Sequence, residues 1–205
     1  MKLSLGKKTA LLIFLILLID QSLKFWIKTH MMLRQQYNVF DDWFIIQYIE
    51  NNGMAFGLEF GGQIGKLILS VFRILAVVGI GWYLVHIIKT KAHTGFVLCI
   101  ALILAGAVGN IIDSAFYGIL FNSSEYQVAH FLPKGGGYSS FLHGRVVDML
   151  YFPIINGHFP SWFPIWGSQQ FIFFRPVFNI ADSSITIGVA IILLFQKRFF
   201  KHDKV

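Results

Sequence analysis

Four long apolar runs constrain this chain more than any other feature of its sequence. They cover about residues 9–28, 64–88, 95–116 and 177–195, and each is close to the roughly 20 residues that an α-helix needs to cross a bilayer. Hydrophobic residues make up 56% of the chain and charged residues only 13%, a balance that excludes a large soluble catalytic domain. We therefore expect an all-α membrane protein with four transmembrane helices, formed by residues 1–205 as a single domain.

The basic residues between these runs predict the orientation of the chain. Residues 1–8, 89–94 and 196–205 contain nine Lys or Arg residues, whereas the much longer segments 29–63 and 117–176 contain four. The positive-inside rule then places both termini in the cytoplasm and the two long segments outside. Because the basic residues flank the helices and form no amphipathic stripe, we attribute the net charge of +7 to topology. We expect no nucleic-acid partner.

The two outer segments differ in composition. The first contains a strand-like piece, Trp43–Ile49, before a turn at Asn51, Asn52 and Gly53, which predicts a small extracytoplasmic β element. The second, extended outer loop is rich in aromatic residues, Pro and Gly, a composition typical of the headgroup region. This composition is compatible both with a lid over a site and with a surface loop that has no catalytic role.

Acidic residues are rare, and their positions are informative because a charge at the centre of a span costs about 2.5–3.5 kcal/mol on insertion scales. The chain has ten acidic residues, and four of them can converge on the extracytoplasmic side: Asp20, Asp113, Asp148 and Asp182. A structural role explains Asp20 and Asp113 well, since Lys24 lies one helical turn from Asp20. Asp148 and Asp182 lie in apolar surroundings, where a carboxyl group tends to have a raised pKa. We predict a functional role for these two.

Two neighbouring carboxylates provide a specific chemistry. At about 4 Å they repel each other by about 4 kcal/mol at an effective dielectric constant near 20, so one of them stays protonated. Aspartic peptidases need this state, in which the ionised group takes a proton from water and the neutral group polarises the carbonyl. A small ion-coupled transporter or channel is the alternative. A transporter or channel is expected to have carboxylates along the full depth of the membrane, whereas the inner halves of these helices lack carboxylates.

Other peptidase chemistries match the sequence poorly. Ser139 and Ser140 lie near Lys134, but in a Gly-rich loop that offers no buried surroundings for a serine–lysine pair. The seven histidines show no HExxH or comparable ligand spacing. We therefore expect an enzyme without a metal ion or other cofactor.

Five short blocks occur in a fixed order along the chain, and together they resemble lipoprotein signal peptidase, also called signal peptidase II, the bacterial aspartic peptidase of the inner membrane. The blocks are Asp20–Lys24, Asn51–Gly57, Gly109–Asp113, Val146–Asp148 and Phe178–Asp182. The resemblance implies that Asp148 and Asp182 form the catalytic pair. It also implies a surrounding polar or substrate-binding shell, formed by Asp20, Asn51, Asn110, Asp113 and Asn179.

The same resemblance implies a substrate and a location. The substrate would be a prolipoprotein signal peptide that ends before a diacylglyceryl-modified cysteine. The enzyme would lie among membrane lipids in the inner membrane, with its site near the extracytoplasmic face. We expect it to act as a monomer.

The arginines depart from the pattern of this family. The family usually has Arg after the aspartate of the third block, where this chain has Ser114. Arg145 is our candidate for the missing guanidinium. Arg73, within the second apolar run, either snorkels to the membrane surface or pairs with one of the aspartates, and the sequence favours snorkelling. The intervals on both sides of Asp148 are longer than usual in the family, which indicates an enlarged outer loop.

Overall fold

The computed structural model describes residues 3–52 and 62–200. In these residues, three helices are long and apolar enough to cross a membrane: α1 (Leu5–His30), α2 (Gly62–Lys89) and α3 (Thr94–Ile112). The fourth predicted span corresponds to α5 (Ile180–Leu194), an apolar helix of only 15 residues. The prediction of long apolar helices is therefore confirmed for three of the four runs, and the length of α5 alone does not establish a crossing.

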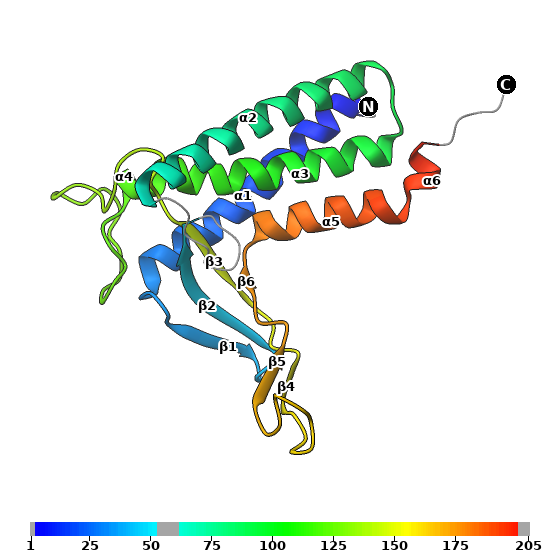
Figure 1. The fold of residues 1–205 in the computed structure, drawn as a ribbon. Coiled ribbons are helices and arrows are strands. Elements are labelled where there is room, and N and C mark those ends of the chain that lie inside the picture. The colour runs from blue at the N-terminus through cyan, green and yellow to red at the C-terminus, as the bar shows by residue number, and fades with distance from the viewer. Residues whose placement is uncertain (1–2, 53–61, 201–205) are drawn as a thin grey trace.

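The helices form one layer with two distinct ends (Figure 1). The start of α1, the turn between α2 and α3, and the short helix α6 (Gln196–Phe199) lie at one end, and the β-strands lie at the other. The chain segments richest in Lys and Arg therefore share one end of the layer. This arrangement agrees with the topology that the loop charges predict.

The third helix changes its winding where the site begins. After α3 the chain continues as a π-helical turn, η2 (Asp113–Tyr117), and then as the short α4 (Gly118–Leu120). Such π-turns occur often at functional sites because they alter the direction of side chains along a helix. Here the change of winding begins at one of the four predicted aspartates.

The β structure is larger than the sequence predicted. Strands β1 (Gln36–Phe40), β2 (Phe44–Asn51), β3 (Val146–Tyr151) and β6 (Val177–Phe178) form an antiparallel sheet in the order β1-β2-β3-β6. The expected β element is present as the hairpin of β1 and β2, whose turn lies at residues 41–43. The description as all-α is too narrow, because β2 pairs with the distant β3, and local hydrophobic patterns do not reveal such long-range pairing. The predicted turn residue Gly53 and residues 54–57 of the same block lie outside the described residues.

Two parts of the outer loop have different structures. Residues 121–145 are tied to the helix ends: Ser124 Oγ accepts from Lys28 Nζ (3.0 Å), and Lys66 Nζ donates to the carbonyl of His143 (2.9 Å). The second part contains a two-stranded sheet, β4 (Ile155–His158) with β5 (Gln170–Phe173), which extends away from the helix layer (Figure 1). The bonds of residues 121–145 favour the surface-loop alternative for that part, and the lid remains an untested prediction.

Close helix packing brings the sequence blocks of different helices together. A Cβ atom on Gly106 of α3 would lie 2.2 Å from the carbonyl oxygen of Ala181 in α5, and one on Gly109 would lie 2.8 Å from a carboxylate oxygen of Asp20. Any side chain at these two positions would force α3 away from its neighbours. These glycines allow α1, α3 and α5 to meet at the level of the aspartates.

Candidate active site

All four predicted aspartates lie at the end of the helix layer where the sheet begins. Asp20 belongs to α1, Asp113 starts η2, Asp148 lies in the middle of β3, and Asp182 lies in the first turn of α5. Asp20 and Asp113 are fully buried, and Asp148 is 3% exposed. Burial on this scale requires that each carboxylate has close polar partners.

Asn179 connects the two aspartates predicted to be catalytic. It is the N-cap of α5: its side-chain oxygen accepts from the backbone N–H of Asp182 (2.8 Å), and the Asp182 carboxylate accepts from the N–H of Asn179 (3.4 Å). This reciprocal pair is a capping box. The amide nitrogen of Asn179 also donates to Asp148 Oδ1 (2.7 Å). One buried side chain therefore orients Asp148 and fixes the helical turn that carries Asp182.

Two further asparagines complete the contacts of this pair. Asn110 of α3 donates to Asp182 Oδ1 (2.7 Å), and Asn51 at the end of β2 donates to Asp148 Oδ2. Burial, followed by the nearby charge of Asp182, raises the pKa of Asp148 to about 7, against the weaker opposing effect of its hydrogen bonds. The folded protein therefore favours the protonated form of Asp148 more than water does.

Asp20 and Asp113 have a common partner in Lys24. Its ammonium group lies 2.9 Å from Asp20 Oδ2 and 2.8 Å from Asp113 Oδ2, and it donates to Asn110 Oδ1 (3.0 Å). The pairing of Asp20 with Lys24 that the sequence predicts is present, and it extends to Asp113. Gln21 adds a bond to each carboxylate (3.0 and 2.9 Å).

The same two carboxylates also bind the backbone beside the candidate catalytic residues. Asp20 Oδ1 accepts from the N–H of Ala181 (2.9 Å), and Asp113 Oδ2 accepts from the N–H of Val147 (3.2 Å). Ala181 directly precedes Asp182, and Val147 directly precedes Asp148. We call this whole set the aspartate network: Asp20, Gln21, Lys24, Asn51, Asn110, Asp113, Asp148, Asn179 and Asp182.

The arginines do not follow the sequence predictions. Arg145, our candidate for the missing family arginine, pairs with Glu50 Oε2 (3.3 Å) and lies over the ring of Tyr138. Arg73 interacts electrostatically with Asp182, which supports the alternative of an aspartate partner over simple snorkelling. The hydroxyl of Ser114 donates to the backbone carbonyl of Asn110 (3.1 Å) and therefore supplies no charge.

Sequence reasoning missed a second group of buried polar residues around Glu50. Lys28 lies one helical turn beyond Lys24 on α1, and its side chain is fully buried against Glu50, Tyr48 and Ser124. The only available signal was the i, i+4 spacing of the two lysines, which places them on one face of the helix. Glu50 belongs to the strand that was predicted, but its distant partner Arg145 has no local signal.

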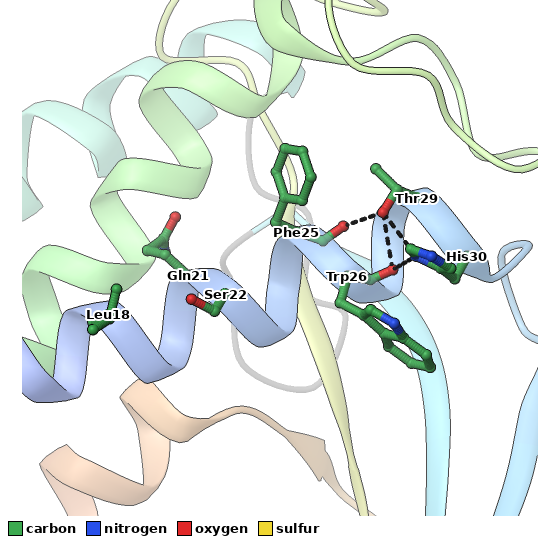
Figure 2. A pocket seen from close by; sticks show the side chains of 7 residues that line it. All are labelled: Leu18, Gln21, Ser22, Phe25, Trp26, Thr29 and His30. Atoms are coloured by element: carbon green, nitrogen blue, oxygen red, sulfur yellow. Dashed lines mark hydrogen bonds between the residues drawn. The ribbon is translucent and has the colours of Figure 1, made fainter.

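A shallow pocket of about 480 Å³ lies on the outward face of α1 (Figure 2). Its lining residues recur at helical spacing along this one helix: Leu18, Gln21, Ser22, Phe25, Trp26, Thr29 and His30. Around its polar end, the Thr29 hydroxyl and the His30 ring bond to the backbone carbonyl of Trp26 and to each other. Apart from Gln21, it contains no member of the aspartate network.

Comparisons with known proteins identify the family to which this chain is similar. The family profile described as signal peptidase (SPase) II matches residues 12–198. A lipoprotein signal peptidase of Porphyromonas gingivalis (strain ATCC 33277) is 50% identical over 194 residues, which cover 94% of this chain and 84% of that protein. One of Amoebophilus asiaticus is 37% identical and covers 89% and 75%, respectively. A solved bacterial membrane enzyme superposes with a TM-score of 0.58 at 26% identity, covering 97% of this chain and 94% of that one.

Proposed function

This chain belongs to the signal peptidase II family and functions as a lipoprotein signal peptidase, and we propose that Asp148 and Asp182 are the catalytic pair with which it cuts prolipoproteins. The observation that carries this proposal is the position of Asn179, whose side chain bonds to Asp148 while it caps the turn that carries Asp182. Family membership does not favour the alternative of a transporter or channel.

The two carboxyl groups take different parts in hydrolysis. Asp148, with its raised pKa, holds the shared proton and donates it in a hydrogen bond to the carbonyl oxygen of the scissile bond. Asp182 acts as the base: it takes a proton from the attacking water, which adds to the carbonyl carbon. When the tetrahedral intermediate collapses, Asp182 passes the proton it took from water to the leaving amine, Asp148 retains its own proton, and the pair is again singly protonated.

The rest of the aspartate network keeps this pair in position. Asp20 and Asp113 bind the N–H groups of Ala181 and Val147, so that the backbone on the N-terminal side of each catalytic residue is fixed. Lys24 neutralises part of the charge of these two carboxylates. Positioning of this kind matters because misplacement by about 1 Å costs on the order of 100-fold in rate.

The substrate and the orientation follow from the family and from the charge pattern. The substrate is the signal peptide of a prolipoprotein that carries a diacylglyceryl-modified cysteine, and it enters laterally from the bilayer. Both termini face the cytoplasm, so the aspartate network lies towards the extracytoplasmic face of the inner membrane. This assignment is supported by the common location of the basic segments at the opposite end of the helix layer. The enzyme acts as a monomer, and residues 1–205 form one domain.

Replacement of either catalytic carboxylate tests the proposal. Asp148→Asn and Asp182→Asn, purified and assayed on a lipidated prolipoprotein, should each lower turnover by at least about 10²-fold, because each residue has its own proton-transfer role. The matched control is Asp41→Asn, which changes an exposed aspartate in the β1–β2 turn and should retain the activity of the parent enzyme. Activity near that of the parent in either catalytic variant would refute the assignment.

A further inference from the structure

A second set of buried charges lies beside the aspartate network and takes no part in the proposed chemistry. We call it the Glu50 cluster; its members are Lys28, Tyr48, Glu50, Ser124 and Arg145. The Lys28 ammonium group donates to Glu50 Oε1, to the Tyr48 hydroxyl (3.1 Å) and to Ser124 Oγ (3.0 Å). The side chain of Lys28 is fully buried, and that of Glu50 is 2% exposed.

Glu50 remains ionised in this environment because both of its oxygens have cationic partners. Oε1 faces Lys28, and Oε2 faces the Arg145 guanidinium at 3.3 Å. Burial by itself would raise the pKa of Glu50, but Lys28, the Tyr48 hydroxyl and Arg145 together hold it below its usual range. The Glu50 carboxylate on β2 therefore binds Lys28 of α1 and Arg145, which directly precedes β3, so that one charged group joins the three segments.

The sheet register shows why that connection matters to the active site. Between β2 and β3, Ile46 faces Leu150 but Ile49 faces Asp148, so β2 contains one extra residue at this point. Such a bulge interrupts the ladder and allows the strand beyond it to shift. Beyond the bulge, Glu50 faces Val147 and Asn51 faces Val146.

Asn51 follows Glu50 directly, and successive side chains of a strand point to opposite faces. Asn51 donates to Asp148, whereas Glu50 points to Lys28 and Arg145. The ladder between the bulge and the end of β2 is short, so the pairing of strands alone defines this register weakly. The ion pairs of Glu50 hold the strand from its other face, against both a helix and the neighbouring strand.

We propose that Glu50 is a positioning residue of the peptidase: its ion pairs with Lys28 and Arg145 fix the end of β2 in the register that brings Asn51 to Asp148. This inference rests on the proposed function of Asp148. Glu50 lies outside the aspartate network. Under this proposal, the rate of cleavage depends on a charge that does not contact the substrate.

The test is a double-mutant cycle between Glu50 and Asn51 in the full-length enzyme. Glu50→Gln should lower kcat on a lipidated prolipoprotein about 10- to 100-fold, the effect of a small misplacement of catalytic groups, while KM stays within about twofold. In an Asn51→Ala background the same substitution should change kcat by no more than about twofold, because the contact through which it acts is already absent. Glu125→Gln, which removes an exposed glutamate of the outer loop, is the matched control.

A purely structural role of Glu50 predicts a different result. Glu50→Gln would then reduce thermal stability but leave kcat per folded enzyme unchanged, or the two substitutions would lower kcat independently. Either result would overturn the inference. If Asp148→Asn remained active, the proposed function itself would fail. If Asp148→Asn were inactive and Glu50→Gln had the kcat and KM of the parent enzyme, only the role of Glu50 would be refuted.

Arg145 provides a second test if Glu50→Gln does not fold. The side chain of Arg145 is 40% exposed, so Arg145→Gln removes the bond between the strands and leaves the buried Lys28–Glu50 pair intact. We expect a fall in kcat of about three- to tenfold, since one of the two ion pairs remains, and recovery in Arg145→Lys, which retains the charge. Parent kcat values in both variants would overturn the inference.

Discussion

Two lysines one helical turn apart on α1 organise two different parts of the molecule. Lys24 and Lys28 are both fully buried. Lys24 faces the other helices and binds two carboxylates, Asp20 and Asp113, whereas Lys28 faces the sheet and binds one, Glu50, which Arg145 shares. The two proposals give these like charges different roles: Lys24 holds the backbone beside the proposed catalytic residues, whereas Lys28 helps to set the register of a strand.

The largest expected effect is that of removing Lys24. Lys24→Met leaves Asp20 and Asp113 as buried neighbouring carboxylates without a cation, and breaking a buried pair in this way costs about 3–5 kcal/mol. We expect a large fall in thermal stability in detergent and loss of cleavage. Lys89→Met, at the exposed end of α2, is the control and should resemble the parent enzyme. A stable and active Lys24→Met enzyme would show that the network does not depend on this charge.

We expect Lys28→Met to reduce stability less than Lys24→Met does. Glu50 keeps Arg145 as a partner, so the cost should be about 1–3 kcal/mol, the range for leaving a buried polar group without one of its partners. In the double variant Lys28→Met/Glu50→Gln, much of the stability should return, because no buried carboxylate is left without its partner. Thermal unfolding of the three variants decides this, and a double variant less stable than Lys28→Met would contradict it.

The smallest effect concerns the pH dependence that Asp148 contributes. Its pKa is raised in the folded protein to about 7 from an ordinary value of 3.8, so the folded state favours the protonated form. Its contribution to stability is complete below pH 3.8 and is lost as the pH rises through about 7. Cleavage, which needs the shared proton, should decline over the upper part of the same range.

Measurements of melting temperature and of turnover at pH 5.5 and 8 test this expectation. The parent enzyme should be the more stable at the lower pH, and the difference in melting temperature should shrink in Asp148→Asn. An equal pH dependence in the two proteins would assign the effect to another group.

Local pattern explains which parts of the structure were predictable. The apolar runs predict α1, α2 and α3, and the i, i+4 spacing predicts the contact of Asp20 with Lys24, because these features depend on neighbouring residues. The convergence of the aspartates was expected from their common depth and from the family resemblance. Their detailed contacts, such as the bond from Asn179 to Asp148, depend on how separate elements pack.

Long-range pairing explains what was missed. The pairing of β2 with β3 joins segments far apart in the sequence, and the contact of Glu50 with Arg145 exists only because that pairing forms. Arg145 is the candidate that the sequence provides for the missing family arginine. In the structure its charge is paired within the Glu50 cluster.

The short length of α5 has a consequence for the membrane itself. Fifteen residues of α-helix rise only about 22 Å, and a typical hydrocarbon core is about 30 Å thick. In the proposed orientation, with the basic residues of α6 at the inner surface, a thinner outer leaflet beside the start of α5 would accommodate this hydrophobic mismatch. Asp182 would then lie at the bottom of a local depression in the bilayer surface. Water could reach the scissile bond there, while the acyl chains of the substrate stay among the acyl chains of the outer leaflet.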